Sequence, residues 1–331
     1  MGIKITGIGQ YVPELVITND DLAKVVDTSD DWIVKRTGIS SRRIANGELA
    51  YQMGVKAANE ALEDAKITVD EVDMIIATTM SPDCFTPSVA CLIGNELRMK
   101  KAVAFDINVA CTGYVYAFDL ARNFLEMGAY RNILIVSTEI MSRMVDFEDR
   151  STCVLFGDGA SATVVTKSKG LYASILGGNP SGAYKLFAKV RHHNNPWDKI
   201  QRSYGSEKVD EFPYGNIYME GEEIFKFATT TLPKLVLTTL DKAGLTIDNL
   251  DLLVPHQANE RILQVANKKL KLPEERLYFG IKEYGNISSA CIPLGLYHLK
   301  KKNLLKAQNK ICIAGFGAGL TYGAAVFEWE S

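Results

Sequence analysis

Cys111 is the first residue of this chain that has the setting of a nucleophile. It follows the apolar run AFDINVA and directly precedes a segment with helical periodicity, so it stands where a strand turns into a helix. The free N–H groups and the positive dipole end of a helix start favour thiolate over thiol. Position alone is weak support for nucleophilic catalysis, because most cysteines at helix starts are small core residues.

Two further polar residues occupy comparable positions in the second half of the chain. His256 follows the strand-like run LDLLVP, and Asn286 lies in the turn YGNIS ahead of another helical segment. In open α/β sheets, ligands gather at the ends of strands. A histidine satisfied within the core and an asparagine in an ordinary turn are the alternatives, so neither residue alone predicts a catalytic site.

A glycine-rich turn, GFGAGLTYG, runs from Gly315 to Gly323 between two predicted strands. Glycines let a backbone approach a ligand closely and point N–H groups at it. The spacing is similar to a dinucleotide-binding fingerprint, but only eight residues follow Gly323. They are too few for the helix and strand that such a fingerprint requires, so we reject nicotinamide binding.

Alternating strands and helices must position these residues. Buried strands are predicted at 73–79, 102–107 and 132–138, with a helix over 112–127 that ends at Gly128. The second half repeats the scheme, with helices predicted at 222–243, 258–270 and 288–301 and strands at 250–254, 310–314 and 321–328. This alternation predicts an α/β fold with a mostly parallel sheet covered by helices.

The chain also contains an internal repeat. The segment ALEDAKITVDEVDMII from Ala61 is similar to TLDKAGLTIDNLDLLV from Thr239, and the same offset places Cys111 opposite Ser289. We therefore predict two similar halves, 1–170 with the cysteine and 171–331 with the histidine and the asparagine. The polar stretch 177–215, rich in Gly and Tyr, predicts a long irregular loop at the seam between them.

Composition excludes several classes of protein. The 331 residues are 47% hydrophobic, which excludes a disordered chain. The 37 basic and 39 acidic side chains give a net charge of −2, which lacks the excess of positive charge typical of nucleic-acid-binding proteins. We expect no membrane span and no export signal, hence a cytoplasmic protein. Six scattered cysteines predict free thiols, and the adjacent His192 and His193 lack the spacing of metal ligands.

Taken together, these motifs resemble the 3-oxoacyl-[acyl-carrier-protein] synthase III family of the thiolase superfamily. The resemblance runs through most of the chain, in GIGQYVPE, DDWIVKRTGI, AFDINVACTG, DRSTCVLFGDGA, VPHQANERI, YGNISSA and GFGAGLTYG. By resemblance, thiolases have a second cysteine at the position of Asn286, and elongating synthases have a second histidine there. The length favours this family over the longer chalcone-synthase type. The resemblance implies a thiolase-like fold, with two similar halves layered αβαβα.

The resemblance implies a decarboxylating Claisen condensation that initiates type II fatty acid synthesis. Cys111 would take the acyl group of an acyl-CoA primer, with the backbone N–H groups of Cys111 and Ala318 as oxyanion donors. The family usually has glycine at the position of Ala318. His256 and Asn286 would donate hydrogen bonds to the enolate formed when malonyl-acyl carrier protein loses CO2. No metal or organic cofactor would be required.

Binding residues follow from the same resemblance. Three residues match coenzyme A contacts of the family: Trp32, Arg36 and Arg150. Phe85 and Thr86 match a loop that crosses a homodimer interface to line the partner's acyl pocket. Four residues would form the contact with acyl carrier protein: Lys226, Gln257, Arg261 and Lys268. Glu222 stands near the expected pantetheine tunnel, where the family has Asn.

The sequence also allows other hypotheses about function. A related synthase of secondary metabolism would use a different acyl group or acceptor, and Glu222, Thr86 and the stretch 177–215 favour it. A papain-type hydrolase is disfavoured by the internal repeat and by the lack of a CGSCW-like motif. A non-catalytic binding protein is disfavoured because the cysteine, the histidine and the asparagine are all present.

Overall fold

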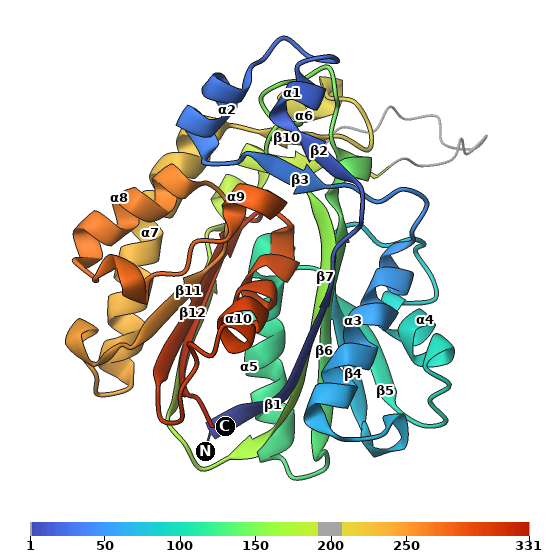
Figure 1. Ribbon diagram of the computed structural model, residues 1–331, viewed down its shortest axis with the longest axis vertical. Coiled ribbons are helices and arrows are strands. Elements are labelled where there is room, and N and C mark those ends of the chain that lie inside the picture. Colours follow the sequence, from blue (N-terminus) through green and yellow to red (C-terminus); the bar gives the residue numbers. More distant parts are fainter. Residues whose placement is uncertain (1, 191–206, 331) are drawn as a thin grey trace.

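Two β-sheets face each other across a pair of central helices in the computed structural model, and further helices cover the outer face of each sheet (Figure 1). The structure describes residues 2–190 and 207–330. Short apolar runs form the sheets, because strands buried on both faces need apolar residues at successive positions. The sequence of helix, sheet, helix, sheet and helix layers confirms the predicted αβαβα fold.

The first sheet is built from residues 2–168. Its strand order is β1 (Gly2–Tyr11), β7 (Asp158–Ser168), β6 (Asn132–Ile140), β4 (Met74–Thr78) and β5 (Val103–Ile107). β4 runs parallel to β5 and β6, whereas β7 runs antiparallel to β6 and β1. The three parallel strands therefore end at the same edge of the sheet, and β5 is the outermost strand.

The second sheet is built from residues 172–328 and repeats most of this topology. Its strand order is β8 (Tyr172–Gly178), β13 (Thr321–Glu328), β12 (Lys310–Gly317) and β11 (Leu252–Pro255). β11 and β12 are parallel, and β13 is antiparallel to both β12 and β8. This order matches β1, β7, β6 and β4 of the first sheet.

The internal repeat extends to the turns that lead into the central helices. Two 3₁₀ turns, Ala110–Thr112 and Ser288–Ala290, occupy the positions that the sequence offset makes equivalent. Their first residues share an unusual backbone, with φ of 46° at Ala110 and 45° at Ser288. Non-glycine residues rarely adopt positive φ, so its recurrence at equivalent turns marks a duplicated local structure.

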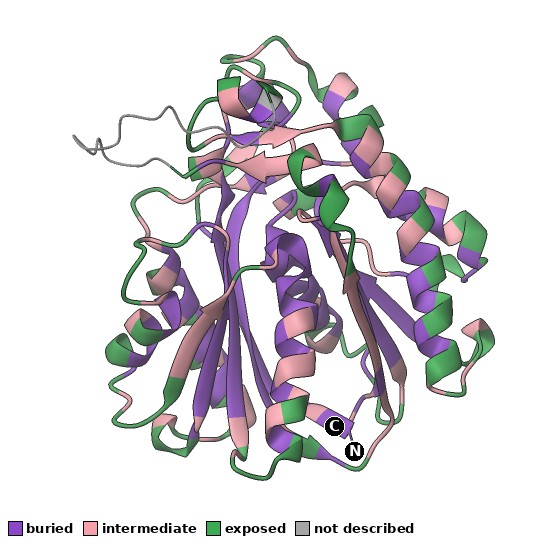
Figure 2. Cartoon of the chain, turned by 180° about the vertical axis from the view of Figure 1, so that it is seen from behind, coloured by how far each residue is buried: buried purple, intermediate pink, exposed green. Residues whose placement is uncertain are grey.

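Six longer helices bury the sheets. α3 (Ala50–Ala65) and α4 (Val89–Glu96) cover the first sheet, α7 (Gly221–Lys242) and α8 (Glu260–Leu270) cover the second, and α5 (Gly113–Glu126) and α10 (Cys291–Lys301) lie between them. Figure 2 shows that the strands and the inner helices are the buried part of the molecule. Their apolar faces form three cores, one for each layer of helices.

A cap of small elements covers the edge at which the parallel strands end (top of Figure 1). It contains β2 (Val16–Thr18), β3 (Ser41–Arg43), β9 (Leu186–Ala188), β10 (Ile217–Met219), α1 (Asn19–Leu22), α2 (Asp30–Thr37), α6 (Glu207–Glu211) and α9 (Ile281–Tyr284). Arg42 anchors it, because its buried guanidinium donates to Asn19 Oδ1 at 2.8 Å and to the carbonyl of Val154 at 2.9 Å.

The stretch 177–215 is more ordered than its composition predicts. Its described parts hold a 3₁₀ turn at Pro180–Lys185, β9 and α6. Aromatic packing explains the order, since the ring of Phe187 lies 5.7 Å from that of Phe212 and 5.0 Å from that of Tyr218. The prediction of an irregular loop is therefore wrong for these parts, and His192 and His193 lie outside the described residues.

Neither 2–190 nor 207–330 contains a helix that is long and apolar enough to cross a membrane. The same residues contain no group of three His, Cys, Asp or Glu side chains that could hold a metal ion.

Candidate active site

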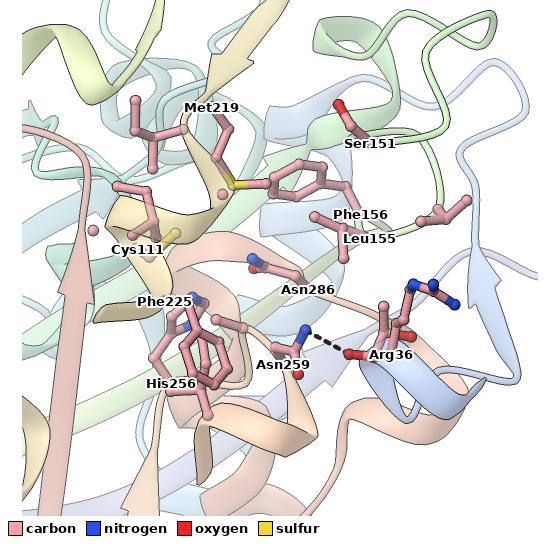
Figure 3. A pocket seen from close by; sticks show the side chains of 18 of the residues that line it. Arg36, Cys111, Ser151, Leu155, Phe156, Met219, Phe225, His256, Asn259 and Asn286 are labelled. Carbon is pink, nitrogen blue, oxygen red and sulfur yellow. Dashed lines mark hydrogen bonds between the residues drawn. The ribbon is translucent and has the colours of Figure 1, made fainter. Parts of the chain in front are cut away.

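Cys111, His256 and Asn286 line one cavity at the edge of the sheets where the parallel strands end. They come from the 3₁₀ turn before α5, from the end of β11 and from the turn before α10. Figure 3 shows all three near one end of this cavity, with Arg36 toward the other. The structure therefore brings together the three residues predicted for catalysis, which are 145 and 30 positions apart in the chain.

Cys111 is held against the glycine-rich turn of the second half. It is 7% exposed. A Cβ at Gly317 would lie 3.0 Å from the Cys111 nitrogen and 3.3 Å from its Cβ, so only glycine allows the two backbones to approach without displacement. This close approach joins the last strands of the second sheet to the predicted nucleophile of the first half.

The protonation state of Cys111 differs from the expectation at a helix start. Burial raises the pKa of its thiol to about 12; the Ser288 hydroxyl opposes this shift and the Glu139 carboxylate adds to it. Loss of solvation outweighs the favourable helix start, because the charged form loses most when water is excluded. The resting form is the thiol, and the expected preference for thiolate is wrong for the free protein.

His256 is uncharged in the same surroundings. Burial lowers the pKa of its imidazole to about 3, so the neutral form prevails near pH 7. Its backbone N–H donates to the carbonyl of Ala314 at 2.8 Å, and its ring packs edge-on against Phe316 with centroids 5.5 Å apart. Among the described residues, its Nδ1 has no hydrogen-bond partner.

Hydrogen bonds fix which side of the Asn286 amide is available. The backbone N–H of Ser288 donates to Asn286 Oδ1 at 2.8 Å, which occupies the carbonyl side of the amide. Backbone bonds to Leu155 at 2.8 Å and from Gly157 at 3.1 Å hold the turn itself. The NH2 group of Asn286 is thus left as the donor that this residue can offer to a ligand.

Ala318 follows Gly317 in the turn between β12 and β13. Its φ is not positive, so the alanine side chain imposes no strain and the backbone N–H is retained. Ala318 and Ala110 both border a second cavity, whose wall also includes Met80, Ser81 and Ile217. The two residues flank Cys111, so this cavity lies beside the predicted nucleophile.

Trp32, Arg36 and Arg150 line the cavity that contains Cys111. The guanidinium carbon of Arg36 lies 4.3 Å from the centroid of the Trp32 ring and that of Arg150 lies 5.1 Å from it. Arg150 also contacts the Asp27 carboxylate at 3.3 Å. An aromatic ring with two guanidinium groups near it suits contact with a base and phosphates, which the family resemblance implies for coenzyme A.

The predicted contacts with acyl carrier protein divide into two groups. Lys226, Arg261 and Lys268 are exposed, and the Arg261 guanidinium lies 5.9 Å from the ring of Phe225, which lines the cavity. Glu222 is exposed on the first turn of α7, next to the lining residue Gly221. Lys226 and Arg261 therefore stand next to the lining residues Phe225 and Ile262, whereas Lys268 lies seven residues further along α8.

Gln257 requires a correction, because it is buried and only 2% exposed. Its Nε2 donates to the carbonyls of Pro255 at 2.9 Å and Tyr278 at 3.2 Å, and its Oε1 accepts from the N–H of Gly280 at 2.9 Å. Its polar side-chain atoms thus hold the turn that carries His256 against the segment 278–280. Gln257 is a scaffold residue, and its assignment to a docking surface is wrong.

The Phe85 loop lies at the surface of the chain. Phe85 is 84% exposed and borders the second cavity, whereas Thr86 is exposed and is not among the described residues that line either cavity. Sequence patterns did not single out Glu139 and Ser288, which stand beside Cys111. The repeat offset that pairs Cys111 with Ser289 points to this turn in the sequence, and the recurrence of positive φ at Ala110 and Ser288 is a second signal that is visible in three dimensions alone.

Comparisons with known proteins agree with this geometry. Two family models of 3-oxoacyl-[acyl-carrier-protein] synthase III match, one over residues 105–179 and its C-terminal counterpart over residues 240–329. β-Ketoacyl-[acyl-carrier-protein] synthase III of Clostridium acetobutylicum is 42% identical over 329 residues, which cover 99% of this chain and 98% of that protein.

Solved structures give the same result. 3-Oxoacyl-[acyl-carrier-protein] synthase III from Aquifex aeolicus is 40% identical, with a TM-score of 0.90 over 99% of this chain and 100% of that one. The priming β-ketosynthase of the R1128 polyketide pathway is 33% identical, with a TM-score of 0.89 over 100% of this chain and 97% of that one.

The fold and the site define an acyltransferase of the thiolase-like class. Identities of 40% and more over almost the whole length then settle its place within that class. The chain belongs to the 3-oxoacyl-[acyl-carrier-protein] synthase III family, as the sequence motifs predicted.

Proposed function

We propose that this chain joins the acyl group of an acyl-CoA primer to malonyl-acyl carrier protein by decarboxylating condensation, and so initiates fatty acid synthesis. The observation that carries the proposal is the single cavity in which Cys111, His256 and Asn286 lie at one end and Trp32 and Arg36 at the other. Such a cavity can hold a thioester at the cysteine while its nucleotide remains near the surface.

In the first half-reaction the Cys111 sulfur attacks the carbonyl carbon of the acyl-CoA thioester. The backbone N–H groups of Cys111 and Ala318 stabilise the oxyanion of the tetrahedral intermediate. The C–S bond to coenzyme A breaks, and coenzyme A leaves as a thiol with the proton that Cys111 gives up. Because the resting cysteine is a thiol, this proton moves as the sulfur attacks.

In the second half-reaction malonyl-acyl carrier protein occupies the same cavity and loses CO2. The electron pair of the broken C–C bond forms an enolate, whose oxygen accepts hydrogen bonds from the neutral imidazole of His256 and the NH2 group of Asn286. The enolate carbon then attacks the acyl-cysteine ester. The C–S bond to Cys111 breaks, the sulfur leaves as a thiolate that takes up one proton from solvent to restore the thiol, and the 3-oxoacyl thioester leaves on the carrier protein.

The proposed enzyme acts with a carrier protein and as a dimer. Acyl carrier protein docks over the exposed cations Lys226 and Arg261 beside the cavity lining and over Lys268 further along α8. Two copies of the chain form a homodimer, supported by the exposure of Phe85 at the border of the second cavity. The reaction uses no metal or organic cofactor, and the enzyme works in the cytoplasm.

A second candidate within this family is a synthase of secondary metabolism. The observation that favours it is Glu222, whose carboxylate adds negative charge beside the cavity, where the family resemblance implies Asn. The similarity to a priming ketosynthase of a polyketide pathway gives this candidate a precedent. It would share the acyl-cysteine step and differ in the acyl group or the acceptor.

Intact-mass spectrometry of the purified protein tests both candidates. Incubation with a panel of acyl-CoAs should add one acyl group to the wild type and none to Cys111→Ala, whose fold is checked by circular dichroism. Addition of malonyl-acyl carrier protein should then remove the acyl group and yield 3-oxoacyl-acyl carrier protein. An adduct on Cys111→Ala would contradict the nucleophile, and discharge only to another acceptor would favour the second candidate.

A further inference from the structure

Glu139 is a buried carboxylate that the proposed mechanism does not use. It lies near the end of β6, beside the other parallel strand ends, and has no exposed surface. Its Oε2 accepts from Ser81 Oγ at 2.9 Å, the Met80 N–H at 3.0 Å and Thr79 Oγ1 at 3.2 Å, and its Oε1 accepts from Ser289 Oγ at 2.8 Å. Four donors match the acceptor capacity of an ionised carboxylate.

These bonds join two segments that border the site from opposite halves of the chain. Met80 and Ser81 form part of the wall of the second cavity, beside Ala110 and Ala318. Ser289 belongs to the turn that follows Asn286, and its hydroxyl also accepts from Thr78 Oγ1 at 2.9 Å. Ser288 in the same turn contacts the sulfur of Met80 at 3.4 Å.

We propose that Glu139 is a positioning residue for the acylation of Cys111, which fixes the wall of the second cavity relative to the turn that carries Asn286 and Ser288. This inference rests on the proposed function, because it takes the second cavity as the place where the acyl group of the primer binds. Without the carboxylate, the two segments lose their common anchor, and the acyl carbonyl and the Cys111 sulfur lose their relative alignment. A misplacement of about 1 Å can slow a reaction about 10²-fold.

The charge of Glu139 provides a readout that an ordinary packing role would not affect. Among the described residues, the ionisable side chains near the Cys111 thiol include His256, which is neutral, Cys291, whose pKa burial raises, and Glu139. Burial also raises the pKa of Glu139, but the hydrogen bonds that its carboxylate accepts oppose this shift and favour the ionised form. In that form Glu139 disfavours the Cys111 thiolate by charge repulsion. Removal of this charge should therefore make Cys111 react faster with an alkylating agent at a given pH.

The test compares Glu139→Gln, Glu139→Asp and Ser289→Ala with a control, Asp158→Asn. Asp158 is also fully buried, but its carboxylate accepts from Ala45 at 2.8 Å and from the N–H and hydroxyl of Ser142 at 2.8 and 2.6 Å. The control therefore measures the general cost of a lost buried charge. Acyl loading of Cys111 is followed by intact mass, and alkylation by iodoacetamide is followed from pH 7 to 9.

We expect Glu139→Gln to load acyl groups about 10²-fold more slowly than the wild type while it is alkylated about threefold faster or more. Glu139→Asp retains the charge, so its alkylation should match the wild type although its loading is slower. Ser289→Ala breaks the link to the turn and should slow loading, which keeps the test decisive if Glu139→Gln does not fold. Asp158→Asn should leave the alkylation profile unchanged.

Two results would overturn the inference: wild-type loading by both Glu139→Gln and Ser289→Ala, or the same change in alkylation for Glu139→Gln and Asp158→Asn. Alkylation needs no substrate. A wild-type protein that accepts no acyl-CoA would therefore contradict the proposed function, while the alkylation profiles would still test the position and charge of Glu139.

Discussion

Burial controls the charge of Cys111 and His256. It raises the pKa of Cys111 to about 12 and lowers that of His256 to about 3, so both side chains are uncharged at neutral pH. A neutral imidazole and the NH2 group of Asn286 remain good hydrogen-bond donors at these buried positions. The site is thus suited to stabilise an oxyanion without a permanent ion pair.

Substitution of the two donors should separate the half-reactions. His256→Ala or Asn286→Ala each removes a hydrogen bond to the enolate, so loss of CO2 from malonyl-acyl carrier protein should slow about 10²–10³-fold. Acyl loading of Cys111 should change only a few-fold. Asn123→Ala, at an exposed position of α5, is the control. Equal losses in CO2 release and in intact-mass loading would contradict this division of roles.

Protonation of His256 should also make stability depend on pH. Its pKa falls from 6.5 in the unfolded chain to about 3 in the folded protein, so the unfolded state binds the extra proton first as the pH drops. The contribution of His256 is complete above pH 6.5 and is lost progressively toward pH 3. Between pH 7 and 4.5 the protonation of His256 in the unfolded chain should lower the free energy of unfolding by about 2.5 kcal/mol.

Chemical denaturation at both pH values measures this contribution. His256→Asn is less stable at pH 7 but lacks the ionisable ring, so its stability should fall less on acidification than that of the wild type. His298, whose pKa burial also lowers, and the carboxylates contribute to both proteins. An equal fall in the two proteins would show that His256 is not held neutral by the fold.

At the scale of elements, the helix pair α7 and α8 forms the opening of the cavity. Phe225 and Ile262 face the cavity, and their chain neighbours Lys226 and Arg261 are exposed beside it. Phe225 adjoins Lys226 and Ile262 adjoins Arg261 along the chain. The two helices therefore both line the cavity and place positive charge beside it. A local cationic surface allows a chain with a net charge of −2 to bind an acidic partner.

Charge reversal at this opening should weaken the encounter with acyl carrier protein. Arg261→Glu should raise the KM for malonyl-acyl carrier protein several-fold, most strongly at low salt, because exposed charges act mainly on association. Acyl loading from acyl-CoA should stay within about twofold. Lys234→Glu makes the same change in net charge at an exposed position further along α7. Unaltered carrier-protein kinetics for Arg261→Glu at low ionic strength would remove the docking surface.

At the scale of the whole molecule, duplication places equivalent turns at the same edge of two sheets. The turns at Ala110–Thr112 and Ser288–Ala290 meet because their sheets enclose the same central helices. The first sheet carries β5 as an additional outer strand, and its first residue, Val103, is 42% exposed. An open strand edge with exposed apolar side chains is a site where another chain can pair.

We therefore expect a homodimer in solution, with β5 at its interface. Light scattering coupled to gel filtration should give twice the mass of the chain, 36.5 kDa. Val103→Lys should shift the protein toward monomer and lower its activity, because a charge on an apolar edge opposes pairing. Val25→Lys, at another exposed valine, should remain dimeric. A fully active monomeric wild type would exclude a shared site.

The sequence by itself determined the class of fold, the family and the three residues of the site. Apolar runs and helical periods are local properties, so β4, β5, α5 and α10 appear close to their predicted bounds. Cys111, His256 and Asn286 stand in motifs of characteristic spacing, and the repeated segments from Ala61 and Thr239 gave the duplication. Each motif, and each copy of the repeat, is a run of residues that lie near one another along the chain.

Only the tertiary structure decided burial and partners. The position after His256 looks polar in the sequence, yet Gln257 is buried because segments 21 and 23 residues further along supply its hydrogen bonds. The helix start at Cys111 predicts a thiolate. The second half of the chain buries this cysteine, however, and the loss of solvation raises the pKa of its thiol. Glu139 meets Ser289 across 150 residues. Solvent exclusion and such long-range contacts depend on how distant segments pack, which no local pattern encodes.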